Sequence, residues 1–147
     1  MEIDVEKLKK DWAGSVFDTV ELEIKAEDLR DYALACGEIA PCYTEPSHPD
    51  FRAVPNFASR YVGRRVLPDS FPRLSDGFGF DAGKCVTVLG AIRPGDRVTA
   101  KSRIHDIYTK TGRSGTMLFI VHRMEFSNQR GEPVSIVDWR MVQRARS

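Results

Sequence analysis

The second half of the chain alternates apolar and polar residues over four segments, and this pattern restricts the fold more than any other feature. A two-residue period is typical of β-strands with one buried face. The segments cover residues 85–89, 98–108, 117–126 and 134–142. In the third segment, residues 118–121 are apolar on both faces, which predicts a central, buried strand. Short turns join the segments, such as the one at residues 128–131. Parallel pairing needs a long crossover between strands, so we predict that these strands form an antiparallel sheet.

The first half of the chain supplies a further strand and one helix. Residues 16–24 alternate from Val20 onward, which predicts a strand. Residues 25–36 carry apolar side chains at a helical spacing, which predicts an amphipathic helix. Gly37 follows directly and can end that helix in a left-handed conformation.

Proline and turn-forming residues divide the region between this helix and the sheet. They predict loops over residues 38–54 and 63–82, with a short helix over residues 55–62 between them. Residues 1–15 form a short amphipathic leader. A strand, a helix, loops and then an antiparallel meander define an α+β fold, which we expect to be a curved sheet wrapped around one helix.

The composition is that of one soluble domain over residues 1–147. Lysine and arginine number 22 against 21 acidic residues, so the charge gives no basis for binding nucleic acid. No apolar run approaches the ~20 residues of a membrane span, and the start of the chain does not resemble a signal peptide. The three cysteines form no CxxC pair, which predicts reduced thiols, no zinc site and a cytoplasmic location.

Residues 32–43 resemble the hydratase motif of the MaoC-like (R)-specific enoyl-CoA hydratases and dehydratases. That motif has an aromatic residue, small residues and then Gly-Asp-x-Asn-Pro-x-His, and Gly37 and Pro41 match it. Later segments are also similar to the family, in order and spacing: residues 53–58, 81–84, 92–96, 108–115 and 126–132. The resemblance covers roughly residues 15–145 and is best with the N-terminal-type, FAS1-like dehydratase domain.

The resemblance implies a hot-dog fold, in which a curved antiparallel sheet wraps around a central helix. It also implies a coenzyme A or acyl-carrier thioester as the substrate, with no cofactor. In the family, the motif's Asp and His are the catalytic pair. Here Glu38 stands at the Asp position, Ala40 at the Asn position and Tyr43 at the His position.

Hydration of an α,β-unsaturated thioester needs a base for the water, a proton for Cα and a donor to the thioester oxygen. Glu38 keeps the carboxylate but is one methylene longer, and a displacement of about 1 Å can cost on the order of 10²-fold in rate. Tyr43 is a poor base at neutral pH, since a phenol has a pKa of roughly 10. His48 is the one histidine near enough in sequence to take part. Each of these residues also has an alternative without a catalytic role. Glu38 would be a charged residue just past a helix end, Tyr43 a packed loop aromatic and His48 a solvated loop histidine.

Four further residues are candidates for contact with the substrate. Pro55, Asn56 and Phe57 match the family segment that lines the acyl pocket. Arg60 is one of several basic residues that could bind the phosphates of coenzyme A or of a carrier arm. The alternative for Arg60 is ordinary solvated surface, and for Phe57 it is the core.

The first hypothesis is a MaoC-like subunit that shapes the acyl tunnel beside a catalytic partner chain, because its own pair is degraded. A curved sheet also leaves edge strands that a second sheet would cover, which favours a homodimer or a heteromer. Three alternatives stay open. They are a self-sufficient homodimeric hydratase that uses Glu38, a non-catalytic acyl-CoA-binding protein, and a thioesterase.

Overall fold

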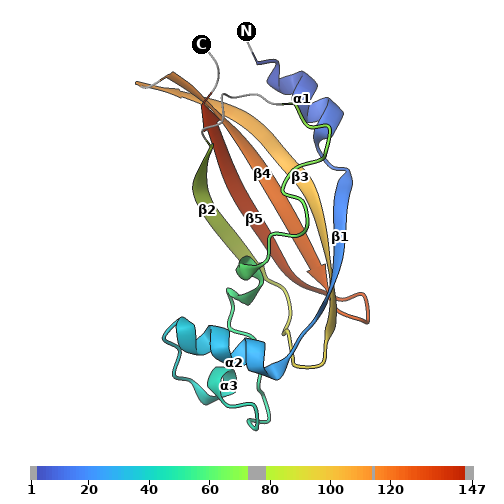
Figure 1. Ribbon diagram of the computed structural model, residues 1–147, viewed down its shortest axis with the longest axis vertical. Coiled ribbons are helices and arrows are strands. Elements are labelled where there is room, and N and C mark those ends of the chain that lie inside the picture. Colours follow the sequence, from blue (N-terminus) through green and yellow to red (C-terminus); the bar gives the residue numbers. More distant parts are fainter. Residues whose placement is uncertain (1–2, 73–78, 114, 145–147) are drawn as a thin grey trace.

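The computed structural model describes residues 3–72, 79–113 and 115–144, which form one antiparallel sheet with helices at its two ends (Figure 1). The helices are α1 (Val5–Trp12), α2 (Ala26–Ala35), α3 (Pro41–Thr44) and the 3₁₀ helix η1 (Phe57–Arg60). The strands are β1 (Val16–Glu23), β2 (Gly79–Val88), β3 (Arg97–Gly112), β4 (Gly115–Ser127) and β5 (Pro133–Arg144). Their order in the sheet is β1-β3-β4-β5-β2. The α+β class and the antiparallel hot-dog sheet are confirmed.

Most predicted elements are confirmed, with changes at their ends. The predicted loop over residues 38–54 contains α3, and the predicted helix over 55–62 is the single 3₁₀ turn η1. The predicted loop over 63–82 is wrong at its end, where β2 begins at Gly79, and residues 73–78 lie outside the described residues. The predicted leader contains α1, whose Leu8 is buried against the sheet.

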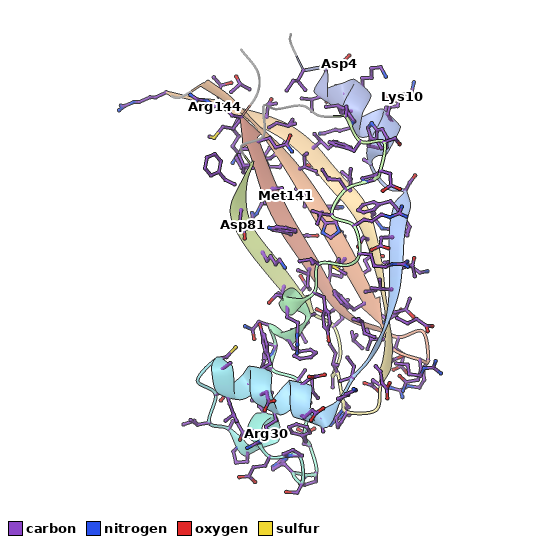
Figure 2. The ribbon with its side chains drawn as sticks, in the orientation of Figure 1. Asp4, Lys10, Arg30, Asp81, Met141 and Arg144 are labelled. Atoms are coloured by element: carbon purple, nitrogen blue, oxygen red, sulfur yellow. The ribbon has the colours of Figure 1, made fainter. Side chains whose placement is uncertain are left out.

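The face of the sheet that carries Val98 and Ala100, here called the inner face, holds two apolar clusters. The α2 cluster contains Leu29 and Ala33 of α2 together with inner-face residues of β3, β4 and β5. The α1 cluster contains Leu8, Ile104, Ile107, Leu118 and Ile120. Figure 2 marks the two ends, with Asp4 and Lys10 at α1 and Arg30 on α2. Helix α2 therefore covers one end of the sheet and does not run along its whole inner face.

An extended segment, residues 61–72, covers the part of the inner face that α2 leaves open (Figure 1). We call this segment the strap. Its Leu67 and Phe71 pack on the α1 cluster, and the rings of Phe71 and Trp12 lie 5.4 Å apart. The strap is not helical because Gly63 has a positive φ of 75° and two prolines follow within ten residues.

Within the described ranges, no helix is both long enough and apolar enough to span a membrane.

Candidate functional site

A cavity of about 400 Å³ lies where α3, residues 52–55 and the segment after β2 meet. Its walls are mostly apolar and comprise Tyr43, Arg52, Ala53, Val54, Pro55, Val88, Leu89, Gly90, Ala91, Ile92, Val134 and Ser135. Two of the predicted site residues, Tyr43 and Pro55, are among them. The cavity adjoins the end of β2, an edge strand of the sheet.

Tyr43 is placed at this cavity by the single turn of α3. Pro41 occupies the first turn, where a missing N–H costs nothing, and the N–H of Tyr43 donates to the Ala40 carbonyl at 3.0 Å. The ring is half-buried against the α2 cluster, and the Arg52 guanidinium lies 5.9 Å from its centroid. The Tyr43 hydroxyl makes no hydrogen bond to any residue that the structure describes, so it keeps its capacity to donate or accept.

Glu38 lies just before α3 and orders the turn that leads into this helix. Its Oε1 accepts hydrogen bonds from the N–H groups of Ile39 and Ala40 at 2.9 and 3.0 Å. Gly37 precedes it with a φ of 76°, which ends α2 and turns the chain toward α3. Glu38 is not part of the cavity wall, so the structure does not bring its carboxylate and Tyr43 together around that space.

His48 belongs to a hydrogen-bonded loop beside the cavity. Its Nδ1 accepts from the Asp50 N–H at 3.1 Å, so in the neutral ring the proton is on Nε2. Asp50 in turn accepts from the Arg93 guanidinium at 2.9 Å. That hydrogen bond, helped by the nearby Arg52 charge and opposed by burial, lowers the pKa of Asp50. His48 therefore helps to order residues 48–50 and does not line the cavity.

The remaining predicted residues build η1 and do not line the cavity. Asn56 is the N-cap of η1, and its carbonyl accepts from the Ser59 hydroxyl at 2.7 Å. Phe57 is 1% exposed and packs edge-on against Tyr32, which supports the core interpretation. The Arg60 guanidinium lies over the rings of Phe57, Tyr32 and Tyr61, at 5.2 Å from the first.

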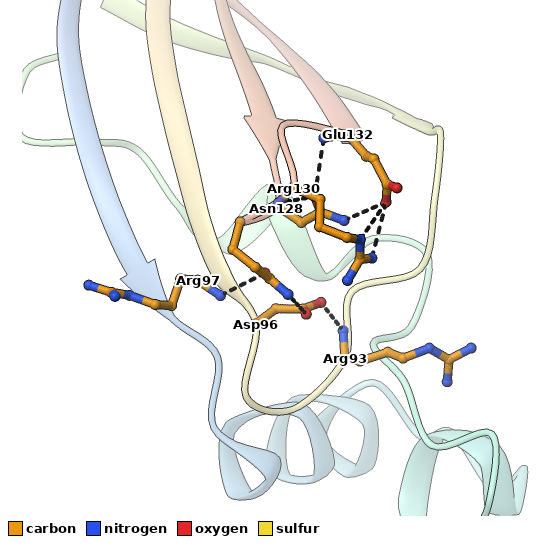
Figure 3. A network of polar contacts seen from close by, with 7 residues as sticks. Arg93, Asp96, Arg97, Asn128, Arg130 and Glu132 are labelled. Carbon is orange, nitrogen blue, oxygen red and sulfur yellow. Dashed lines mark hydrogen bonds and ion pairs between the residues drawn. The ribbon is translucent and has the colours of Figure 1, made fainter.

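A second cavity, of about 450 Å³, shares wall residues 89–91 with the first. Its polar wall is part of the network in Figure 3, which joins the turn before β3 to the turn between β4 and β5. Asp96 accepts from the Arg93 N–H at 2.8 Å and from the Gln129 side chain at 3.1 Å. Arg130 and Glu132 pair with each other at 3.0 Å. These groups already have protein partners, so the network holds the two turns together.

A row of five side chains, one from each strand, crosses the inner face and was not predicted from the sequence. In spatial order this polar row consists of Asp18, Ser102, His122, Trp139 and Lys84. In the register of the sheet, Asp18 lies opposite Ser102, and Trp139 lies opposite both His122 and Lys84. Ser102 lies opposite Met124, and His122 is the next residue along β4 on the same face. The signal was present, because Asp18, Ser102 and His122 occupy inward positions of alternating segments.

The two ends of the polar row hold the strap and the turn before it. Asp18, whose side chain is 2% exposed, accepts from the backbone N–H groups of Arg64 and Arg65 at 2.7 and 3.2 Å. At the other edge, the Lys84 ammonium donates to the Ser59 carbonyl at 2.7 Å. The Asp18 carboxylate thus satisfies two backbone donors of the strap, and the Lys84 ammonium satisfies a backbone acceptor of η1, the turn before it.

Burial shifts the pKa values in this row. Burial alone would raise the pKa of Asp18, but the hydrogen bonds from Arg64 and Arg65 outweigh it and lower that pKa. Burial, with the Lys84 charge nearby, lowers the pKa of His122 to about 4. Burial also lowers the pKa of Lys84, against the attraction of Asp81. At neutral pH the row therefore holds an ionised Asp18 and a neutral His122.

Among the described residues, no three His, Cys, Asp or Glu side chains are grouped so that they could hold a metal ion. The polar side chains in the mostly apolar cavity wall are those of Tyr43, Arg52 and Ser135 among the residues that the structure describes.

Comparison with known proteins gives a family and a fold. Residues 11–137 match the model of the FAS1-like dehydratase domain region. No curated protein matches the chain.

Three solved structures illustrate the likeness in fold. A MaoC-like dehydratase from Rhodospirillum rubrum is 18% identical with a TM-score of 0.59, over 92% of this chain and 94% of that one. The ChsH1-ChsH2 complex from Mycobacterium tuberculosis is 14% identical with a TM-score of 0.67, over 97% of this chain and 90% of that one. A MaoC-like dehydratase from Phytophthora capsici is 19% identical with a TM-score of 0.69, over 97% of this chain but only 50% of that one. Since the family model spans most of the 147 residues and the hot-dog sheet agrees with it, the chain belongs to the FAS1-like dehydratase domain family.

Proposed function

We propose that this chain is a subunit of an (R)-specific enoyl-CoA hydratase or 3-hydroxyacyl dehydratase and shapes the binding site of an acyl thioester. The observation that carries the proposal is that Tyr43, at the position of the family's histidine, lines the cavity of about 400 Å³. Small-molecule sites are typically about 300–1,000 Å³ and mostly apolar with a few polar groups. The mostly apolar wall around the Tyr43 side chain suits an acyl group beside one hydrogen-bonding residue.

The catalytic pair of this subunit is degraded. In hydration, a base takes a proton from water, the water oxygen bonds to Cβ of the enoyl thioester, and Cα receives a proton. Among the described residues of the cavity wall, Tyr43 has no base beside it, and one Glu38 oxygen already accepts two backbone hydrogen bonds. The role that suits Tyr43 is to donate a hydrogen bond and orient the substrate, while a partner supplies the base.

The partner that we infer is a catalytic MaoC-like subunit, and the surface that we assign to it is the β2 edge of the sheet. This edge exposes Phe80, Val88 and Leu89 by 61%, 53% and 48%, and an unpaired edge is a ready site for another strand. The ChsH1-ChsH2 relative is a complex by its name, and the present chain covers half of the Phytophthora capsici chain. Both facts support an assembly of two such domains.

A self-sufficient homodimer is the second candidate, and one observation favours it. Only Oε1 of Glu38 accepts hydrogen bonds from described residues, so Oε2 keeps its lone pairs for a water molecule. In this alternative Glu38 is the base, with Tyr43 or His48 of either protomer beside it.

The test follows the loss of enoyl-thioester absorbance with crotonyl-CoA and a longer enoyl-CoA. We expect little turnover from the protein alone and the same low rate for Glu38→Gln and for the control Glu27→Gln, an exposed residue of α2. Co-expression with a MaoC-like chain that keeps Gly-Asp-x-Asn-Pro-x-His should restore hydration. Fast turnover that only Glu38→Gln abolishes would replace the heteromer with the self-sufficient enzyme. Release of free coenzyme A would instead indicate a thioesterase. Binding without turnover, both alone and with the MaoC-like chain, would indicate an acyl-CoA-binding protein.

A further inference from the structure

We propose that Arg52 recognises an anionic group of the ligand that occupies the cavity beside Tyr43. The anion is a carboxylate on the acyl chain or a phosphate of the thioester's carrier. This inference rests on the proposed function, because it assumes that the cavity binds an acyl thioester. It adds a charge requirement that neither the family nor the fold supplies.

Backbone hydrogen bonds hold Arg52 in the wall of the cavity from two sides. Its N–H donates to the Cys42 carbonyl of α3 at 3.0 Å, and the N–H of Ala53 donates to the Ile92 carbonyl at 2.8 Å. Its side chain is 38% exposed and lines the cavity beside the Tyr43 ring. The backbone of Arg52 is therefore held at the cavity wall, which keeps its guanidinium within reach of the ligand space.

Among the described residues that line this cavity, Arg52 is also the only charged one. The other wall residues are apolar apart from Tyr43, Ser135 and backbone groups. A charge beside apolar walls is screened less than one in open solvent, so its attraction for an anion is stronger there. One guanidinium without a carboxylate in the same wall selects a ligand of opposite charge.

The donors of Arg52 are free to bind such a ligand. Asp50 forms an ion pair with Arg52 at 3.6 Å from Nη1, a distance that exceeds that of a hydrogen bond. Asp50 instead accepts a 2.9 Å hydrogen bond from Arg93. Within the described part of the chain the Arg52 side chain makes no hydrogen bond, so its five N–H donors can bind a carboxylate or phosphate in a bidentate manner.

Two other arginines, Arg93 in the wall of the second cavity and Arg64 in the strap, differ in this respect. Arg93 is bound to Asp50 and the Phe51 carbonyl, and Arg64 is bound to Asp18 and the Thr19 carbonyl. They already have protein partners. The combination of a cavity position with free donors is particular to Arg52 among these residues.

Calorimetric titration of the purified protein tests the inference with four probes. They are butyryl-CoA, glutaryl-CoA, which adds a carboxylate, and the pantetheine thioesters of the same two acyl groups, which lack the phosphates. The variants are Arg52→Gln, Arg52→Lys and, as the matched control, Arg30→Gln, since Arg30 is an exposed arginine of α2 outside the cavity. Urea unfolding of each variant shows that it is folded.

We expect Arg52→Gln to weaken binding of the anionic probes by roughly tenfold or more, Arg52→Lys to weaken it less, and Arg30→Gln to leave it unchanged. A loss confined to the glutaryl thioesters assigns Arg52 to an acyl carboxylate. A loss confined to the coenzyme A thioesters assigns it to the phosphates. Equal affinities of Arg52→Gln and Arg30→Gln for all probes would overturn the inference while leaving the proposed function intact. If Arg52→Gln does not fold, the affinities of Arg52→Lys are compared with those of Arg30→Gln in the same way. A parent protein that binds none of the probes would overturn both.

Discussion

Replacing Asp18 by alanine should destabilise this fold by about 3–5 kcal/mol, because one buried carboxylate holds the strap to the sheet. The carboxylate accepts backbone hydrogen bonds from Arg64 and Arg65 at 2.7 and 3.2 Å. Hydrogen bonds to a charged group contribute about 1.5–3 kcal/mol each, and alanine leaves both donors without a partner. The third contact, from the Arg64 side chain at 3.3 Å, adds little because that side chain is 71% exposed.

The pH dependence of this loss identifies the carboxylate as its cause. The pKa of Asp18 is lowered below its usual 3.8, so its stabilising contribution is complete above the unfolded pKa and disappears as pH falls through the folded pKa. The difference in unfolding free energy between Asp18→Ala and the parent should therefore be equal at pH 7 and pH 5. It should shrink below about pH 4.

Urea unfolding followed by circular dichroism measures this difference, with Asp69→Ala as the matched control. Asp69 also pairs with Arg65, at 3.0 Å, but its side chain is 75% exposed, so its loss should cost at most about 0.5 kcal/mol. Hydrogen exchange at the Arg64 and Arg65 amides should accelerate in Asp18→Ala alone. A cost for Asp18→Ala as small as that of the control, or one that persists unchanged to pH 3, would refute the reasoning.

Three further predictions concern the inner face. His122 should titrate by NMR with a pKa of about 4, and a midpoint near 6.5 would contradict this. Because His122 in the unfolded chain takes up its proton near pH 6.5, the free energy of unfolding should fall by about 3 kcal/mol as the pH drops from 6.5 to 4. Gly63→Ala should lower the free energy of unfolding by about 1–3 kcal/mol more than Gly37→Ala does, as measured by urea unfolding. Both glycines have a positive φ, but only at Gly63 would a Cβ lie 2.8 Å from Asp18, and equal costs would disprove this close contact. Ser102→Ala should be nearly neutral or stabilising in the same assay, because its buried hydroxyl makes no hydrogen bond within the described residues, and a loss above about 1 kcal/mol would reveal a partner.

The regular elements could be predicted because each is encoded by a local period. The alternation over residues 98–104 is regular, and the structure buries the predicted face of β3 at Val98, Ala100, Ser102 and Ile104. After Ile104 a bulge shifts the pairing, so that Ile107 is the next buried residue of β3. A bulge depends on the neighbouring strand, and no local pattern specifies it.

The candidate site was predicted only in part, because its residues meet through tertiary contacts. Tyr43 and Pro55 were identified through their resemblance to a family motif, and both line the cavity. Arg52 lies between them in sequence but has no motif, and its importance depends on Asp50 being bound to Arg93. That arrangement joins two loops about 40 residues apart, which spacing along the chain does not reveal.

The polar row and the strap depend on each other, and this explains why charged residues occupy inward positions of the sheet. A helix satisfies most of its own backbone hydrogen bonds, so it can pack on a sheet surface that is entirely apolar. An extended segment over the same surface leaves backbone N–H and C=O groups that need partners. Asp18 accepts from the N–H groups of Arg64 and Arg65, and Lys84 donates to the Tyr61 carbonyl at 3.4 Å. Relatives with a helix in place of residues 61–72 should therefore carry apolar side chains at the positions of Asp18 and Lys84. A relative with both the helix and the two charges at those positions would show that the row serves another purpose.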